Sequence, residues 1–170
     1  MIRTLINLMR GFRGHPAHPP LTDASIGSYT AGTVAALLGW VGLEEEAMAK
    51  AAFVAVVVGL VISIATIVTG FTDYLRIRRG TELWNTATVH WIVMAFANAA
   101  FIVAAALLEG GFTASEVTTA AALTTLAAFL LLLLGGWIGG AITFVYGMRV
   151  ISEVDKPARD AILKPEFPPD

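Results

Sequence analysis

The residues in this sequence that could do chemistry are its three histidines, two of which lie three positions apart. His15 and His18 stand in the stretch GHPAHPPLTD, and His90 stands in the stretch NTATVHWIVMAFAN. Imidazole nitrogens bind haem iron and other transition metals. The chain contains no cysteine, which excludes disulfides and thiolate metal sites. Any metal chemistry must therefore use histidine, with carboxylates as further ligands.

Two kinds of cofactor site fit these side chains. In the first, His18 and His90 are the axial ligands of haem b, and Arg13 or Arg76 meets the haem propionates. In the second, a single non-haem iron or zinc ion is held by four side chains: His15, His18, Asp73 and His90. A structural alternative stays open. In it, the histidines only hydrogen-bond loop carbonyls and Asp73 pairs with Arg76.

The elements that must position these residues are four long apolar stretches. They contain no Asp, Glu, Lys or Arg, and they are Ala24–Leu43, Ala51–Thr72, Leu83–Leu108 and Val117–Met148. Each reaches the roughly 20 residues that a membrane-spanning helix needs. The chain is 56% hydrophobic and only 14% charged, with a mean hydropathy of +0.74. Because lipid offers the backbone no hydrogen bonds, the sequence predicts an all-α, polytopic membrane protein with a bundle of four transmembrane helices.

The charged residues predict how this bundle is oriented. Ten of the eleven basic residues lie before the first stretch, between the second and the third, or after the fourth. Lys50 lies on the opposite side, together with five acidic residues: Glu44, Glu45, Glu46, Glu109 and Glu116. Lys and Arg in short loops mark the cytoplasmic side. Both termini and all three histidines are therefore predicted to be cytoplasmic, with His90 a turn or two inside the membrane.

This pattern divides the chain into three segments. Residues 1–20 are expected to form an N-terminal segment in the membrane interface, because arginines alternate with apolar residues there. Residues 21–150 form the four-helix membrane bundle, and residues 151–170 form a cytoplasmic tail. The prolines of the tail exclude a continuous helix there.

The prolines beside the first two histidines affect the start of the first span. A residue that precedes a proline is disfavoured in helical geometry, and this applies to both His15 and His18. We therefore expect an extended segment at these histidines. The helix that follows would be capped by Thr22 or Asp23, whose side-chain oxygens accept hydrogen bonds from unpaired backbone N–H groups.

Small residues recur every three or four positions along three of the apolar stretches. One row, within GGWIGG of the fourth stretch, contains Gly136 and Gly140. The rows in the first two stretches are Ser25, Ser28, Gly32, Ala36 and Gly39, and then Gly59, Ser63, Thr66, Gly70 and Asp73. Small residues at this spacing let membrane helices approach closely. We expect these rows to be helix contacts.

Four motifs of the chain resemble those of a bacterial membrane family known as the domain of unknown function 2231. They are GHPAHPPLTDASIG, GFTDY, NTATVHWIVMAFAN and GGWIGGAITFVYGMRV. The resemblance carries over six positions: His15, His18, Asp73, His90, Gly139 and Gly140. The chain departs from the family pattern at Ala24-Ser25, where a proline is frequent, and at Phe144, where a tyrosine is usual. The resemblance implies the bacterial inner (plasma) membrane.

Some members of that family are joined to Rieske iron–sulfur domains, which implies a place in redox chemistry. This chain has no cysteine, so it cannot itself ligate such a cluster. A Rieske-type partner would therefore be a separate protein.

The sequence leaves three functional classes open. The first is a redox-associated integral membrane protein that binds haem b or a metal ion at its cytoplasmic end. The second is a structural accessory subunit of a larger membrane electron-transfer complex, without its own cofactor. The third, a transporter or proton pathway, has the least support because no acidic residue lies in mid-membrane.

The sequence makes fewer predictions about catalysis and partners. No nucleophile and base stand together in a pattern that indicates an enzyme. The expected partners are the lipid bilayer and either further membrane subunits or a second copy of the chain. A net charge of −2 speaks against nucleic acid as a partner.

Overall fold

The computed structural model describes residues 11–12, 15–150 and 156–163. Two strands of two residues come first, β1 (Gly11–Phe12) and β2 (His15–Pro16). Four long helices and one short helix follow: α2 (His18–Trp40), α3 (Glu45–Tyr74), α4 (Glu82–Ala114), α5 (Thr119–Phe144) and α6 (Ala158–Leu163). Arg13, most of the predicted interfacial segment and most of the predicted tail lie outside the described residues.

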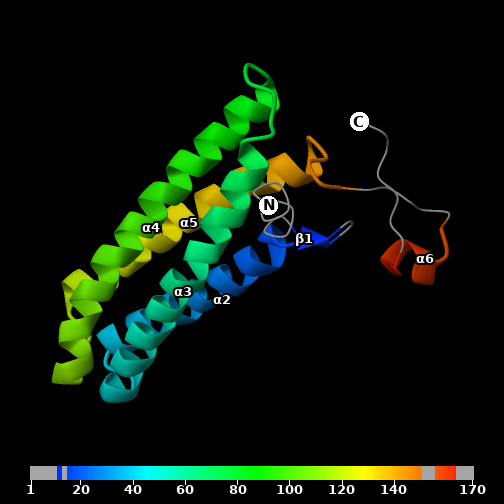
Figure 1. Cartoon of the computed structure of the whole chain (residues 1–170). Coiled ribbons are helices and arrows are strands. Elements are labelled where there is room, and N and C mark those ends of the chain that lie inside the picture. Colours follow the sequence, from blue (N-terminus) through cyan, green and yellow to red (C-terminus); the bar gives the residue numbers. More distant parts are fainter. Residues whose placement is uncertain (1–10, 13–14, 151–155, 164–170) are drawn as a thin grey trace, which may run out of the picture.

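Helices α2 to α5 form a four-helix bundle, which confirms the predicted all-α fold (Figure 1). Helix α2 packs along α3, and α4 packs along α5. The two pairs meet where α3 contacts α4 and where α5 contacts α2. Because short connections join successive helices, neighbouring helices run in opposite directions. The starts of α2 and α4 therefore lie at the same end as the C-termini of α3 and α5.

Three of the four long helices are apolar and long enough to cross a membrane, namely α3, α4 and α5. Their bounds differ by a few residues from the predicted uncharged stretches, because the helices continue into charged flanks. Helix α2 is not among the three. Its sequence contains several hydroxyl side chains that lower its hydropathy: Ser25, Ser28, Thr30 and Thr33. Length and hydropathy therefore support three spans and do not establish the predicted count of four.

The start of α2 differs from the prediction. His15 is extended, as expected, but His18 is the first residue of the helix and is preceded by Ala17 as the N-cap. The two prolines that follow lie in the first turn, where a missing N–H costs nothing because that group has no helical partner. The predicted caps are wrong, since Thr22 and Asp23 lie inside the helix.

The centre of the bundle is built from small residues around a pair of stacked rings. Tyr29 of α2 is 1% exposed. It stacks on Phe101 of α4 with 3.8 Å between ring centroids. Gly59 of α3 lies against the tyrosine ring, and a Cβ at that position would come within 2.7 Å of it. Small residues thus allow close contact between helices, as predicted for the rows in α2 and α3.

The predicted glycine contact in α5 is displaced by one residue. A Cβ added at Gly136 or at Gly140 would have no atom of another element within 4 Å, so these two glycines face outward. Gly135 instead packs against Met94 of α4, and Gly139 packs against His90. The prediction that Gly136 and Gly140 form the helix contact is therefore wrong. The motif GGWIGG contains two glycine rows, and the bundle uses the other one.

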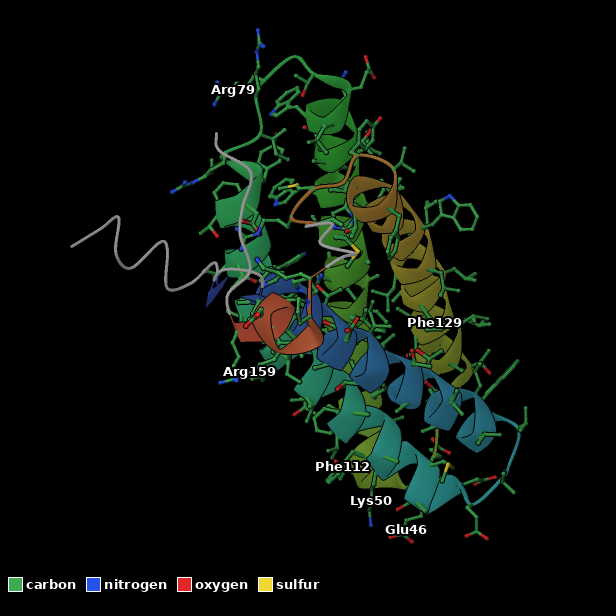
Figure 2. The ribbon with its side chains drawn as sticks, turned by 90° about the vertical axis from the view of Figure 1, so that its right-hand side faces the viewer. Glu46, Lys50, Arg79, Phe112, Phe129 and Arg159 are labelled. Carbon is green, nitrogen blue, oxygen red and sulfur yellow. The ribbon has the colours of Figure 1, made fainter. Side chains whose placement is uncertain are left out.

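The two ends of the bundle differ in charge. Arg79 lies at one end, while Glu46 and Lys50 lie at the opposite end (Figure 2). We call the first the arginine-rich end, defined by Arg76, Arg78, Arg79 and Arg149. The histidine-bearing start of α2 lies at this end. Ten of the eleven basic residues were assigned to one side from the sequence, and the fold agrees with this separation for the residues it describes.

Candidate functional site

His18 occupies the first position of α2 and lies against α3. Its Nδ1–H donates a hydrogen bond to the Thr66 carbonyl oxygen at 3.0 Å. The imidazole covers Gly70, where an added Cβ would come within 2.6 Å of the ring. Because a carbonyl oxygen can only accept, this bond places the proton on Nδ1. The Nε2 lone pair then faces elsewhere, with the Thr22 hydroxyl oxygen 3.5 Å away.

His90 makes the same kind of contact between the other two helices. It lies in the third turn of α4, where its Nδ1–H donates to the Gly135 carbonyl oxygen of α5 at 2.8 Å. The ring covers Gly139, where an added Cβ would lie 3.0 Å from it. As in His18, the proton is fixed on Nδ1 and the lone pair on Nε2.

The two histidines therefore share one local arrangement. In each, the accepting carbonyl lies four residues before the glycine that the imidazole covers, as in Thr66–Gly70 and Gly135–Gly139. A backbone carbonyl on one ring nitrogen is the usual way in which proteins orient a histidine whose other nitrogen binds a metal.

His15 does not join this pair. Its side chain is exposed, and Nε2 donates to the Ile162 carbonyl oxygen of α6 at 2.9 Å. This bond connects β2 with α6, two elements near the arginine-rich end. His18 and His90 thus occupy equivalent contacts in the two helix pairs, whereas His15 binds the backbone of the C-terminal part.

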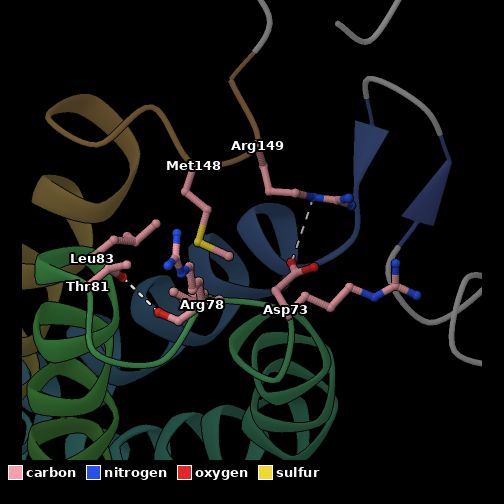
Figure 3. Close-up of a pocket in the computed structure, with 8 residues that line it drawn as sticks. Asp73, Arg78, Thr81, Leu83, Met148 and Arg149 are labelled. Carbon is pink, nitrogen blue, oxygen red and sulfur yellow. Dashed lines mark hydrogen bonds and ion pairs between the residues drawn. The ribbon is translucent and has the colours of Figure 1, made fainter. Parts of the chain in front are cut away.

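Asp73 lies at the end of α3, buried to 7% exposure, and forms an ion pair with Arg149. The distance between Arg149 Nε and Asp73 Oδ2 is 3.8 Å (Figure 3). The ion pair with Arg149, which follows α5, differs from the pair with Arg76 considered from the sequence. An arginine thus contacts this carboxylate, and the role of Asp73 as a metal ligand stays a prediction.

Arg76 lines a cavity at the arginine-rich end, together with Asp73, Arg78 and Arg149 (Figure 3). Neither His18 nor His90 lines this cavity. The two histidines and this group of charged residues are thus neighbouring but separate features. Arg13, the other arginine predicted to meet haem propionates, lies outside the described residues.

The donor set at the histidines consists of two imidazoles. Among the residues that the structure describes, no group of three or more His, Asp or Glu side chains is arranged to hold a metal ion. Zinc sites in proteins use three or four protein ligands. Haem iron, in contrast, takes four nitrogens from the porphyrin and needs only one or two from the protein. Two imidazoles are therefore fewer protein ligands than a bare zinc ion takes, whereas their number does not exceed what haem iron takes from a protein.

A buried polar contact in the bundle centre was missed by sequence reasoning. The Tyr29 hydroxyl of α2 donates to Asn98 Oδ1 of α4 at 2.9 Å, and Asn98 Nδ2 donates back to the Met94 carbonyl oxygen at 3.0 Å. The signal in the sequence is a lone asparagine inside an apolar run. Such residues in membrane helices face the bundle interior and find partners there.

Comparison with known proteins identifies a family. The family model described as "Predicted membrane protein (DUF2231)" matches residues 14–152 of the chain. The resemblance seen in the four motifs is thereby confirmed. The match includes both histidine-bearing segments, all four long helices and Arg149. No curated protein and no solved structure matches the chain.

Proposed function

Because the chain belongs to the family of predicted membrane proteins known as domain of unknown function 2231, we propose that all four long helices, α2 included, span the lipid bilayer. Helix α2 has 23 residues, or about 34 Å of helix against about 30 Å of hydrocarbon. Its hydroxyls donate to carbonyls one turn back, as in Ser25 to Leu21 and Thr33 to Tyr29. They therefore do not require water, which supports a place for α2 in lipid.

The proposed orientation puts the arginine-rich end in the cytoplasm of a bacterium, because basic loops are retained there. Single cysteines at Glu45, Gly80 and Ala114 test this in intact cells with a membrane-impermeant thiol reagent, since the native chain has no cysteine. Labelling is expected at Glu45 and Ala114 and not at Gly80. The reverse pattern would invert the orientation. A pattern in which Glu45 and Gly80 both react would contradict the assignment of α3 as a span.

The function that the geometry supports best is that of a redox-associated membrane protein with a b-type haem. The observation that carries this proposal is the pair of histidines, His18 and His90, each with Nδ1 bound to a backbone carbonyl and Nε2 left with its lone pair. These two side chains would hold a haem iron through their Nε2 atoms. A haem held there supplies one-electron transfer between ferrous and ferric iron.

Each part of the site would have a defined role in this proposal. The carbonyls of Thr66 and Gly135 orient the imidazoles, and Gly70 and Gly139 provide the space that the rings occupy. The glycines thus accommodate the imidazoles themselves. Arg76 lies at the same end and supplies positive charge for propionates. A separate Rieske-type protein or another membrane subunit would exchange electrons with the site.

An optical spectrum of the purified protein tests the haem. The wild-type protein should show a Soret band that shifts on reduction, and His18→Ala and His90→Ala should each lose it. His15→Ala is the matched control, because this exposed histidine contacts α6 and should leave the band unchanged. Elemental analysis distinguishes the alternative: about one equivalent of iron or zinc without a Soret band would replace haem by a bare metal ion. A folded protein with neither would contradict the cofactor proposal.

The second candidate function is that of a structural accessory subunit without a cofactor. The observation that favours it is that both histidine contacts join neighbouring helices, His18 joining α2 to α3 and His90 joining α4 to α5. In this case the imidazoles stabilise the bundle and a larger membrane complex binds its outer face. His90→Ala would then lower thermal stability in a protein that has no Soret band and no bound metal.

A further inference from the structure

A cavity lies at the arginine-rich end, apart from the two histidines. It is lined by the end of α3, the connection from α3 to α4, the start of α4 and the turn that follows α5. Its volume is about 430 Å³, and it is a wide hollow in the surface. This volume falls within the range of roughly 300–1,000 Å³ that is typical of small-molecule sites. Figure 3 shows the labelled lining side chains in two groups, with Asp73 and Arg149 on one side and Arg78, Thr81, Leu83 and Met148 on the other.

The polar lining of the cavity is positively charged. Its lining contains three arginines, Arg76, Arg78 and Arg149, and one carboxylate, Asp73. The Asp73 carboxylate is within 3.8 Å of Arg149 Nε and so positions that side chain at the cavity. The backbone of Arg149 is left-handed, with φ at 63°, a geometry that a non-glycine residue adopts at a cost. The turn after α5 thus adopts an unfavourable backbone conformation at Arg149, and in this conformation the guanidinium group lies near the end of α3.

Most of the remaining lining is apolar. Ile77, Leu83 and Met148 contribute hydrocarbon surface to the same cavity. Tyr74 and Trp84 stack next to it, with 6.2 Å between ring centroids. Tyrosine and tryptophan are enriched where membrane helices meet the headgroup layer. The cavity therefore offers cationic groups and apolar surface side by side at the level of lipid headgroups.

From these observations we propose that the cavity binds the phosphate of an anionic phospholipid headgroup. Arginine matches phosphate in geometry as well as in charge, because its planar fork donates two parallel hydrogen bonds to phosphate oxygens. Basic pockets between membrane helices bind anionic headgroups in this way. The apolar lining favours a lipid over free phosphate, since Ile77, Leu83 and Met148 would contact the glycerol and the first acyl carbons. The proposal shares Arg76 with the proposed haem site, but its test uses Arg78, which has no role there.

Native mass spectrometry of the detergent-solubilised chain measures this binding as phosphatidylglycerol is added. The comparison uses two adjacent arginines, of which Arg78 lines the cavity and Arg79 does not. Arg78→Gln should weaken phosphatidylglycerol binding about fivefold, the effect expected for one basic residue at an anionic headgroup. Arg79→Gln should change it less than about twofold by the same reasoning. Arg78→Lys keeps the positive charge but loses the planar guanidinium group that donates two parallel hydrogen bonds. Its loss of phosphatidylglycerol binding should lie between those of Arg78→Gln and Arg79→Gln.

Several outcomes would overturn the proposal. Equal weakening by Arg78→Gln and Arg79→Gln would mean diffuse attraction to the surface instead of a site. Equally tight binding of phosphatidylcholine would remove the requirement for an anionic headgroup. Binding of inorganic phosphate alone, with the same dependence on Arg78, would overturn the lipid assignment and make a soluble phosphate compound the ligand. Size-exclusion profiles and melting temperatures identical to the wild type establish that each variant is folded.

Discussion

The two helix pairs of the bundle use one contact twice, in different surroundings. In α2–α3, His18 binds the Thr66 carbonyl and covers Gly70; in α4–α5, His90 binds the Gly135 carbonyl and covers Gly139. His18 is the first residue of its helix and has hydroxyls of Thr22 and Thr69 within 3.5 Å of its ring nitrogens. His90 lies in the third turn of its helix, among more apolar residues.

This difference shows which part of the contact the fold requires. The polar neighbours vary, whereas the Nδ1–carbonyl bond and the glycine four residues later occur in both pairs. A ring can reach a carbonyl inside a helix only if the side chain one turn further on leaves room, and glycine provides that room. The shared result is a fixed tautomer and a fixed ring plane. A fixed tautomer and a fixed ring plane suit a histidine that binds a metal. They also accompany a hydrogen bond that stabilises the packing of the two helices.

The largest effect is expected where the two helix pairs meet, at Tyr29. Tyr29→Ala removes a ring that is 1% exposed and stacked on Phe101 of the other pair. We expect the free energy of unfolding to fall by about 3–5 kcal/mol, as for other buried aromatic truncations. Unfolding of the protein in mixed SDS and non-ionic detergent micelles measures it. Tyr29→Phe is the control: it loses only the bond to Asn98 and should cost about 0.6 kcal/mol.

A loss below about 1 kcal/mol for Tyr29→Ala would contradict this assignment, because cavity formation alone exceeds that value. The two helix pairs would then be held together by other contacts, such as those between α2 and α5. Tyr29 would then not be the main contact that joins the two helix pairs.

The second prediction tests the glycines of both pairs against an outward-facing glycine. A Cβ would lie within 2.6 Å of the His18 ring at Gly70 and 3.0 Å from the His90 ring at Gly139, but would meet nothing at Gly140. Gly70→Ala should therefore lower the free energy of unfolding by about 1–3 kcal/mol. Gly139→Ala should cost less, because its contact is less close. Melting temperatures in detergent rank the three variants.

Gly140→Ala is the matched control for this series. It should leave stability unchanged or raise it by up to about 1 kcal/mol, since alanine favours helix over glycine. A destabilisation by Gly140→Ala as large as that by Gly139→Ala would mean that the α5 face assigned to lipid is in contact with protein.

The helical spans could be predicted from the sequence because charge marks their ends. Helices α3 and α4 begin at Glu45 and Glu82, beside the uncharged stretches that predicted them. The predicted start of α2 was wrong. A residue before proline is disfavoured in a helix, but prolines in the first turn of a helix lose no hydrogen bond, and here the second effect is decisive. His18 is helical for this reason, and its helical position lets its ring reach Thr66.

The packing face of α5 was not predictable from spacing. In GGWIGG, Gly135 and Gly139 form one row and Gly136 and Gly140 form another, and both rows have a period of four. Only the rotation of α5 against α4 decides between them, and that depends on contacts with Met94 and His90. The sequence could name His90 as a site residue but not its partner.

The roles of the site residues stay predictions, but their contacts show what the sequence could indicate. An ionisable residue stands out in an apolar run, which is why the sequence points to His90, and the motif before the first apolar stretch points to His18. The ion pair of Asp73 with Arg149 follows a left-handed turn after α5, with φ at 63° for Arg149. No local pattern indicates this turn, so the sequence could not predict which arginine contacts Asp73.

The third prediction compares the two histidines directly, in cofactor-free protein. His90→Ala removes the hydrogen bond to Gly135, and a net loss of about 1 kcal/mol is expected. His18→Ala should cost less, because the Thr69 hydroxyl also donates to the Thr66 carbonyl oxygen at 3.0 Å and keeps it satisfied. Unfolding in mixed micelles measures both. A larger loss for His18→Ala would show that the end of α2 contributes more to the bundle than the interior of α4.

The smallest effect is expected at the end of the bundle opposite the arginines, where the two pairs share a peripheral contact. Trp40 Nε1–H of α2 donates to the Thr119 hydroxyl of α5 at 3.1 Å, and the tryptophan side chain is 42% exposed. A hydrogen bond at such an exposed position competes with water and headgroups, so Trp40→Phe should lower the free energy of unfolding by no more than about 0.5 kcal/mol. Thr119→Val removes the same hydrogen bond from the other side, so its loss of unfolding free energy should equal that of Trp40→Phe.

The double variant should lose no more unfolding free energy than the larger single effect, because both substitutions remove one shared interaction. Additive losses would mean that Trp40 and Thr119 act through separate contacts and that this end joins the helix pairs more firmly than its exposure indicates.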